Sequence, residues 1–335
     1  MMPCAVALFS GGLDSMLSVR IMQAQGYVVE ALNIRTIFSC CRARAAQAAA
    51  TLGARLTVMA VGDDYLDVVR NPLYGYGKGV NPCVDCRIYM CRMAARFMEE
   101  VQASVVVTGE IVGQRPMSQK RHQLDLIARR SGLDGRLLRP LSARLLAPTI
   151  PEIEQAVDRE KLYSFSNRGR SGLIELAERL GISKRGIDRI PSPSSGCALT
   201  EPLFATRVRD LMQQHPDAAR WDFELLNHGR HFRFDRQTKI VVGRNAEENA
   251  TLRLMAERAD APEPVLLVPE TFPGPHALIV GEAADPRVLR FAGALILRYA
   301  SHPSPDCPQV RLSARGADRT IAIQPDPTAQ SAATL

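Results

Sequence analysis

Apolar runs and helical patterns alternate along the first part of the chain. Runs such as Ala5–Phe9 are apolar throughout, which is typical of strands buried on both faces. Strands that alternate with helices predict a parallel sheet with helices on both faces, an α/β fold. The expected strands are Ala5–Phe9, Val28–Asn33, Leu56–Ala60 and Val105–Thr108, and the expected helices are Ser15–Gln25, Arg42–Leu52 and Arg87–Gln102.

The pattern changes after Arg220. Short strand-like runs (His231–Asp235, Lys239–Gly243, Val265–Val268, Ala277–Val280) are interspersed with helical patterns at Ala246–Arg258 and Arg287–Ala300. They predict a smaller C-terminal α+β domain. We therefore expect an α/β domain over 1–200, a linker over 201–220, the α+β domain over 221–324, and a disordered tail rich in Pro, Ala, Thr and Gln over 325–335.

Composition narrows the class of protein. The apolar start Cys4–Phe9 is too short to span a membrane, and it lacks the flanks of a signal peptide. We therefore expect a cytoplasmic protein without a membrane partner, whose eight cysteines are mostly reduced. The net charge of +7 is compatible with a polyanionic partner but does not establish one.

The string Ser10-Gly11-Gly12-Leu13-Asp14-Ser15 lies between an expected strand and helix. Its glycines let the backbone approach a phosphate, and the helix start presents N–H groups to the anion. Asp14 cannot attract phosphate by charge, so we expect it to help hold a magnesium ion (Mg2+) that bridges phosphates. No Gly-Lys-Ser/Thr ends the loop, which excludes the Walker A design. The alternative is an ordinary strand–turn–helix junction.

This string resembles the PP-loop ATP pyrophosphatase family. The resemblance implies an adenine nucleotide α-hydrolase-like parallel sheet and cleavage of ATP between the α and β phosphates. It also implies that pyrophosphate binds the loop while a substrate oxygen is adenylated. The ATP-binding residues that it implies are Ser10, Gly11, Gly12, Asp14 and Ser15, with Asn33 among the adenine-pocket residues at the end of the second strand.

Two cysteine motifs stand far apart in the sequence. Cys83-Val84-Asp85-Cys86 follows Asn81-Pro82 just before an expected helix, and Ser194-Ser195-Gly196-Cys197 occurs much later. A helix start favours the thiolate form of a nearby cysteine. By itself, such a CxxC leaves open a structural metal site, a redox pair or no specific role.

Taken together, the cysteine motifs resemble the tRNA 2-thiouridylases. Their catalytic cysteines match Cys83 and Cys197, although their second motif has one more residue before its cysteine. Thr108–Gln114 with Ser118-Gln119 resembles instead the tRNA 4-thiouridine synthases, which adds Thr108 and Gly109 to the ATP site. Over residues 5–200 the chain thus resembles the tRNA-thiolating branch, with features of two subfamilies.

Three cysteines suit a cubane iron–sulfur (4Fe-4S) cluster with one open iron that could hold a hydrosulfide, an arrangement found in some thiolating PP-loop enzymes. In this hypothesis the metal ligands are Cys83, Cys86 and Cys197. In the competing hypothesis Cys197 carries a persulfide, Cys83 resolves it as a disulfide, and Cys86 has no role. A zinc site with Cys91 as fourth ligand is a further alternative. Cys40 and Cys41 are accessory sulfur carriers or ordinary loop cysteines.

Basic residues cluster between positions 115 and 144. This cluster either contacts the phosphates of a nucleic acid or forms a solvated helix face. Its members are Arg115, Lys120, Arg121, Arg129, Arg130, Arg136, Arg139 and Arg144. In the C-terminal domain, Arg244 precedes an expected helix start and forms a candidate anion site. Residues 221–300 resemble the RNA-binding domain of ribosome quality-control factors.

We therefore expect an ATP-dependent tRNA uridine sulfurtransferase. A uridine oxygen attacks ATP, pyrophosphate leaves, and sulfur then replaces the activated oxygen to give thiouridine. The expected partners are tRNA and a sulfur donor, either a cysteine desulfurase, a persulfide carrier or free sulfide; a homodimer is one candidate assembly. The alternatives are an adenylating amide ligase that acts on a small molecule and a non-catalytic RNA-binding factor.

Overall fold

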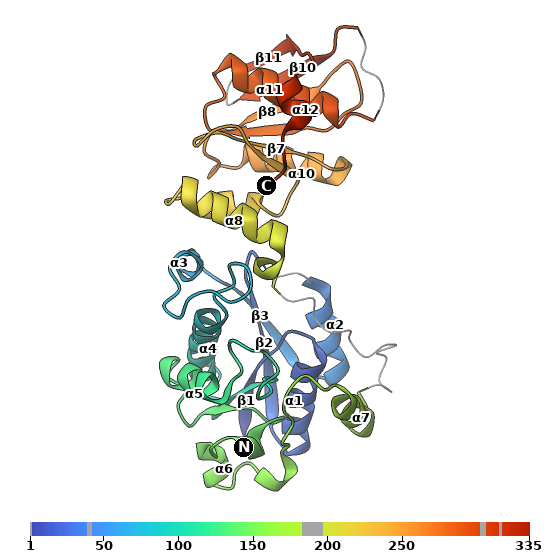
Figure 1. Ribbon diagram of the computed structural model, residues 1–335. Helices are drawn as coiled ribbons and strands as arrows, with labels where there is room; N and C mark the ends of the chain where they lie inside the picture. Colours follow the sequence, from blue (N-terminus) through green and yellow to red (C-terminus); the bar gives the residue numbers. More distant parts are fainter. Residues whose placement is uncertain (1, 39–41, 183–196, 302–305, 315–316) are drawn as a thin grey trace. The chain divides into compact units, whose positions relative to one another are not determined.

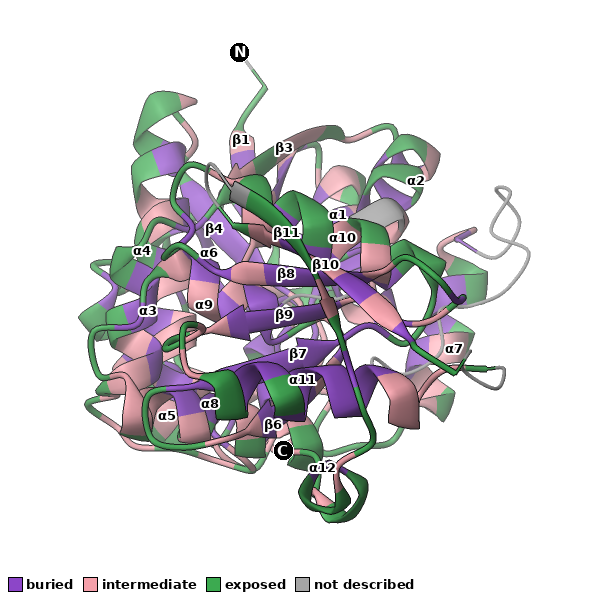
Figure 2. Cartoon of the chain, turned by 90° about the horizontal axis from the view of Figure 1, so that it is seen from above, coloured by how far each residue is buried: buried purple, intermediate pink, exposed green. Residues whose placement is uncertain are grey.

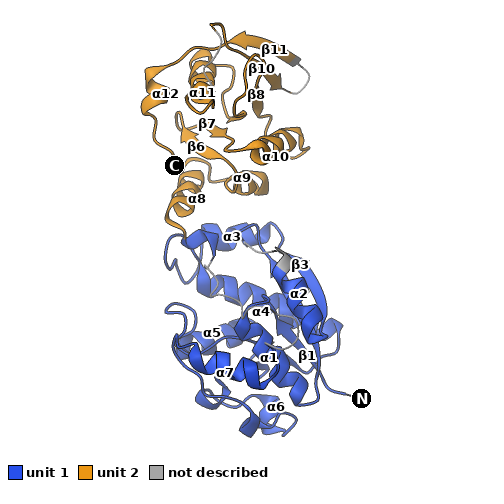
Figure 3. Cartoon of the chain, turned by 90° about the vertical axis from the view of Figure 1, so that its right-hand side faces the viewer, with its two compact units in different colours: residues 1–200 blue, residues 201–335 orange. Residues whose placement is uncertain are grey.

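The computed structural model describes residues 2–38, 42–182, 197–301, 306–314 and 317–335. The chain divides into two compact units, unit 1 (Met1–Thr200) and unit 2 (Glu201–Leu335), which Figure 3 shows in separate colours. Each unit has its own sheet and its own hydrophobic core. None of the helices in the described ranges is long and apolar enough to cross a membrane.

Unit 1 is built on a five-stranded sheet in which every strand pair is parallel. The spatial order is β3-β2-β1-β4-β5, so β1 lies between β2 and β4 and the strand order reverses there. Such a reversal opens a crevice at the carboxyl ends of the central strands, where ligands bind. The strands are β1 (Cys4–Leu8), β2 (Val28–Arg35), β3 (Arg55–Ala60), β4 (Val105–Thr108) and β5 (Leu137–Leu138).

Helices cover both faces of this sheet (Figure 1). On one face α1 (Leu13–Ala24) contacts α2 (Arg42–Leu52) and α7 (Ser171–Arg179), and on the other α4 (Cys83–Glu100) contacts α3 (Asp64–Arg70) and α5 (Arg121–Arg130). The short α6 (Ile150–Ile153) follows β5. Because both faces are covered, the central strands must be apolar throughout, and this confirms the expected α/β class.

Helix α4 begins at Cys83, earlier than the expected start at Arg87. Pro82 precedes its first turn, where a missing backbone N–H costs no helical hydrogen bond. The buried positions Val84, Ile88 and Cys91 recur at helical spacing and face the core. Both cysteines of the CxxC therefore lie within the first turn of the helix.

Unit 2 contains a six-stranded antiparallel sheet in the order β11-β10-β8-β9-β7-β6. Successive residues of β7 pack into two different cores, because Ile240 and Val242 join the hydrophobic cluster of α11 whereas Val241 joins that of α10. Figure 2 shows buried residues along β7, β8, β9 and α11. The strands are β6 (Arg230–Arg233), β7 (Lys239–Val242), β8 (Val265–Pro269), β9 (Ala277–Val280), β10 (Gln309–Ala314) and β11 (Ala317–Ala322), and the main helices are α10 (Ala246–Glu257) and α11 (Pro286–Arg298).

Two segments differ from the sequence-based expectation. The expected linker 201–220 contains α8 (Pro202–Gln214), which buries Ala205, Val208 and Leu211 at helical spacing and is followed by α9 (Arg220–Leu225). The expected disordered tail contains α12 (Pro327–Ser331). The Arg298 guanidinium donates hydrogen bonds to two carbonyls of that tail, so a cation of α11 anchors it to unit 2.

Candidate functional site

The phosphate loop, Ser10–Ser15, connects β1 to α1 at the carboxyl edge of the sheet. Gly11 has a φ of +73°, a conformation that favours glycine, and a Cβ there would lie 2.8 Å from the Cα of Ala45 in α2. The Gly12 N–H donates to Ser10 Oγ at 3.3 Å, and the Ser15 hydroxyl donates to the Gly12 carbonyl at 2.8 Å. The loop is thus a tight turn that leads into the N-terminus of α1, where helical N–H groups lack intrahelical acceptors.

Asp14 is the acidic group of this loop. Gln114 Nε2 donates to Asp14 Oδ2 at 3.0 Å. Burial raises the pKa of Asp14, although the Gln114 hydrogen bond and the positive charges of Arg170 and Arg115 oppose that rise. The carboxylate and the Ser10 and Ser15 hydroxyl oxygens, 3.5 Å apart, offer hard oxygen ligands of the kind that Mg2+ prefers.

The ends of β2 and β4 meet the phosphate loop. A Cβ on Gly109 would lie 2.6 Å from the carbonyl carbon of Asp14, so only glycine permits this approach. The Ser18 hydroxyl of α1 donates to the carbonyl of Thr108 at 3.3 Å. Asn33 Nδ2 donates to the Phe9 carbonyl at 2.7 Å and ties β2 to the start of the loop. The structure therefore brings together the residues that the sequence assigned to the ATP site.

Replacing Gly109 by Ala should displace the phosphate loop, because the added methyl group meets backbone atoms of Asp14 that cannot rotate away. We expect a loss of about 1–3 kcal/mol of unfolding free energy and at least about tenfold weaker ATP binding. Calorimetric titration with ATP measures the affinity. Gly169→Ala is the matched control, since a Cβ there has open space. Equal effects of the two substitutions would contradict the packing argument.

The second cysteine motif lies beside the first. The Val80 N–H, just before the CxxC, donates to the Leu199 carbonyl at 3.0 Å, and Thr200 donates twice to the Cys197 carbonyl. Burial raises the pKa of the Cys197 thiol, and negative charge on Cys86 or Cys83 raises it further. We call Cys83, Cys86 and Cys197 the three-cysteine group. The rest of the motif, Ser194–Gly196, lies outside the described residues, as do Cys40 and Cys41.

Two hydroxyl groups contact the sulfur atoms. The buried Tyr65 hydroxyl donates to Cys86 Sγ at 3.1 Å, and Cys83 Sγ donates to Ser118 Oγ at 3.1 Å. Burial raises the pKa of Cys86 and raises that of Cys197 to about 11. The expectation that the helix start favours thiolate is therefore wrong for Cys86, because desolvation outweighs the Tyr65 hydrogen bond and the positive charge of Arg87. Tyr65 carries no sequence signal, whereas Ser118 belongs to the thiouridine-synthase-like stretch.

The fit of a metal to these thiols is a separate question. Among the described residues, no three His, Cys, Asp or Glu side chains form a group that could hold a metal ion. The described cysteines are free thiols. Cys91, the candidate fourth zinc ligand, is fully buried in the core, and burial followed by the charge of Glu110 raises its pKa to about 12. The ligand roles of the three-cysteine group remain a prediction.

A buried network of ion pairs connects Glu110, which follows β4, with Arg87 of the CxxC helix and with Arg139. Glu110 accepts a hydrogen bond from Arg139 Nε at 3.1 Å and lies 3.6 Å from Arg87 Nε. Burial alone would raise the pKa of Glu110, but the two guanidinium groups outweigh it and hold the pKa below its usual value. Arg139, expected as a phosphate contact, is thus a structural residue with 4% exposure. Arg144 likewise pairs with Glu160.

Replacing Glu110 by Gln should lower the free energy of unfolding by about 3 kcal/mol, because it leaves buried guanidinium charge without a counterion. Since the folded pKa of Glu110 lies below the unfolded value, its contribution exists above the unfolded pKa and is lost as pH falls through the folded pKa. Urea unfolding at several pH values measures both effects. Glu160→Gln, at an exposed pair, should change stability by less than about 1 kcal/mol.

The anion site expected at Arg244 is occupied by a carboxylate of the protein itself. Glu248 accepts hydrogen bonds from the Arg244 backbone N–H at 2.8 Å and from its Nε at 2.9 Å. The Asn245 side chain caps the helix by accepting from the Glu248 N–H. The prediction of a free anion site is therefore wrong, because a carboxylate of the same helix takes the place of the anion.

Comparisons with known proteins agree with these motifs. Residues 3–145 match the family model of the thiamine biosynthesis protein (ThiI), and residues 229–333 match that of the NFACT protein RNA binding domain. No curated protein matches the chain.

Two solved structures are similar to parts of the chain. One is a predicted subunit of tRNA methyltransferase from Methanocaldococcus jannaschii, with 17% identity over 53% of this chain and 76% of that chain, at a TM-score of 0.36. The other is a 4-thiouridine synthetase–RNA complex with bound ATP, with 20% identity over 64% of this chain and 51% of that chain, at a TM-score of 0.38. This chain thus spans about half the length of the synthetase. The two family matches agree with the resemblance of the first part of the chain to thiouridine synthases and of the second part to an RNA-binding domain: residues 3–145 are similar to ThiI, and residues 229–333 are similar to the NFACT RNA-binding domain.

Proposed function

We propose that this protein is an ATP-dependent tRNA uridine sulfurtransferase that works in the cytoplasm. One observation carries the proposal: Gln114 Nε2 donates to Asp14 Oδ2 at 3.0 Å, and Ser118 Oγ, four residues further along the same segment, accepts from Cys83 Sγ at 3.1 Å. The phosphate loop and the three-cysteine group therefore both contact one short segment of unit 1. Residues 3–145, which match the ThiI family model, contain the phosphate loop and the CxxC, and Cys197 lies beside the CxxC in unit 1. An adenylation site next to a sulfur site suits a thiouridine synthase.

The reaction begins with adenylation. The uridine carbonyl oxygen attacks the α-phosphate of ATP, the bond to the β-phosphate breaks, and pyrophosphate leaves onto the phosphate loop. Loop N–H groups stabilise the charge that develops there, and a magnesium ion held by Asp14 would neutralise part of it. We assign ATP binding to Ser10, Gly11, Gly12, Asp14, Ser15, Asn33, Thr108 and Gly109. Sulfur then adds to the activated ring carbon and AMP departs with the oxygen.

Sulfur delivery has two candidate routes. In the first, Cys83, Cys86 and Cys197 would hold a 4Fe-4S cluster, which would supply iron chemistry for binding and delivering hydrosulfide. In the second, Cys197 carries a persulfide received from a cysteine desulfurase or persulfide carrier. Cys83 then attacks Cys197 Sγ, so that the terminal sulfur leaves for the uridine and a disulfide forms, which an external thiol must reduce. The hydroxyl groups of Tyr65 and Ser118 orient the sulfur atoms that they contact.

Mass spectrometry of tRNA nucleosides tests the proposal. Cells that lack the protein should lose one thiouridine, and the purified protein should restore it with ATP and a sulfur donor. The same analysis identifies the ring position of the sulfur. An unchanged nucleoside profile, together with ATP turnover on a small amine, would favour an amide ligase.

Removing unit 2 should weaken tRNA binding more than ATP binding, because the NFACT-type RNA-binding segment lies within Glu201–Leu335. We expect roughly a tenfold or greater loss of tRNA affinity at fixed salt for residues 1–200. Fluorescence anisotropy with labelled tRNA, and ATP titration of the same sample, give the two affinities. Equal tRNA affinity of the shortened and full chains would contradict an RNA-binding role of unit 2.

A further inference from the structure

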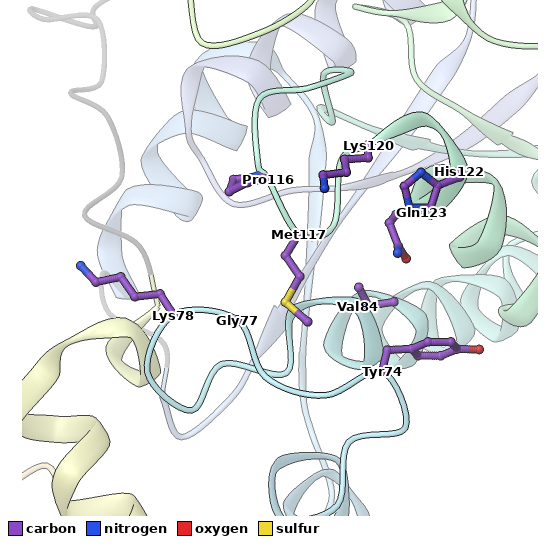
Figure 4. Close-up of a pocket in the computed structure, with 9 residues that line it drawn as sticks. All are labelled: Tyr74, Gly77, Lys78, Val84, Pro116, Met117, Lys120, His122 and Gln123. Carbon is purple, nitrogen blue, oxygen red and sulfur yellow. The ribbon is translucent and has the colours of Figure 1, made fainter.

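A cavity of about 380 Å³ opens beside the CxxC helix of unit 1. Its lining comes from the segment before α4, from the first turn of α4 and from the segment that leads into α5. Figure 4 shows the side chains of Lys120, Met117 and Gln123 turned toward one space, while Lys78 extends outward at the rim. The volume is within the range of small-molecule sites. The cavity could therefore hold a single nucleobase and its phosphate.

The chemistry of the lining is that of a nucleotide site. Tyr74 and Met117 offer aromatic and apolar surface against which a base can stack. Gln123 lines the cavity, and its Oε1 atom has no hydrogen-bond partner among the described residues. Because Oε1 is itself buried, the amide must turn toward the cavity to accept from the N–H edge of a base. The exposed ammonium group of Lys120 is suited to a phosphate.

The cavity shares chain segments with the sulfur site. Val84 stands between the two cysteines of the CxxC, and Met117 directly precedes Ser118, whose hydroxyl accepts from Cys83. Beyond Lys120, the exposed basic residues Arg121 and Arg129 continue along α5. This row of exposed cations favours a polyanionic ligand such as RNA over an isolated nucleotide.

We infer that this cavity binds one nucleotide of the RNA substrate and thereby holds the RNA against the three-cysteine group. The inference rests on the proposed function, since it takes the RNA to be the substrate. Lys120 contacts a phosphate, Gln123 accepts from the base edge, and Tyr74 with Met117 packs against the base. Gln123 and Lys120 are then positioning residues for the thiolation step.

The test uses the full chain and an unmodified tRNA transcript. Lys120→Gln should bind the transcript roughly three- to tenfold more weakly at 150 mM salt, with a salt dependence shallower by about one unit. Gln123→Met should bind about fivefold more weakly with an unchanged salt dependence, because it removes an acceptor and no charge. Arg96→Gln, an exposed cation near the other end of α4, is the matched control and should bind as wild type.

Ultraviolet cross-linking followed by peptide mass spectrometry provides a second readout, with the RNA expected on peptides that contain Tyr74 or Met117. Wild-type affinity in both variants, or cross-links confined to other peptides, would overturn the inference. Failure of the proposed function is distinguishable. If the cross-links and affinity losses occur but wild-type enzyme forms no thiouridine, the RNA site stands and the sulfurtransferase assignment falls.

Discussion

Asp14→Asn is expected to slow pyrophosphate release by at least about a hundredfold while the protein stays folded. The amide keeps the Gln114 contact within reach but cannot supply the negative charge that holds a metal ion against ATP. ATP–pyrophosphate exchange in the presence of tRNA measures the effect. Asp125→Asn, an exposed carboxylate on α5, is the control and should exchange normally. Near-normal exchange in Asp14→Asn would remove this residue from the metal site.

The same substitution should not lower stability. Because burial raises the folded pKa of Asp14 above its unfolded value, the folded state binds the proton more tightly. Ionisation of this carboxyl therefore costs stability as pH rises through the folded pKa, and Asn removes that cost at neutral pH. Catalysis should show the opposite dependence and decline as pH falls through the raised pKa. A urea midpoint for Asp14→Asn well below that of wild type at pH 7 would contradict this reasoning.

Cys197→Ala should reduce thiolation by at least about a thousandfold, because both sulfur routes require this side chain. ATP–pyrophosphate exchange should persist, since the phosphate loop is built from other residues. Thiouridine is measured by nucleoside mass spectrometry in single-turnover reactions. Cys307→Ala, an exposed cysteine of unit 2, is the matched control. Thiolation at the wild-type rate in Cys197→Ala would exclude both routes.

Cys86→Ala separates the two routes. If the three-cysteine group holds a cluster, this variant loses both iron and thiolation. If Cys197 carries a persulfide, wild type contains no iron and Cys86→Ala retains substantial activity. Iron content after anaerobic purification, measured on the same samples as thiolation, gives both answers.

The parts of the fold that depend on local sequence were predictable. The phosphate loop is one example, because strand, glycine turn and helix start are contiguous. The Arg244–Glu248 contact was missed, although a carboxylate four residues after an arginine on a helix is a local signal for an ion pair.

Other features depend on contacts between distant segments. The environment of Cys86 is set by Tyr65 and by burial, neither of which has a local signature. Arg139 looked like part of a basic surface because its partner Glu110 precedes it by a helix and two loops. An arginine in a basic stretch of sequence can thus be buried when it pairs with a carboxylate from a distant segment. The periodicity of the sequence does not predict such a pair.

The raised pKa values of Cys86 and Cys197 have a consequence for oxidative stress. Peroxide attacks the thiolate form of cysteine, and both Cys86 and Cys197 have raised pKa values, so at neutral pH they offer little of that form. An enzyme that handles reactive sulfur would thereby keep these side chains from overoxidation to sulfinic acid between turnovers. The Tyr65 hydroxyl acts in the opposite direction, because its hydrogen bond lowers the pKa of Cys86, but burial outweighs this effect.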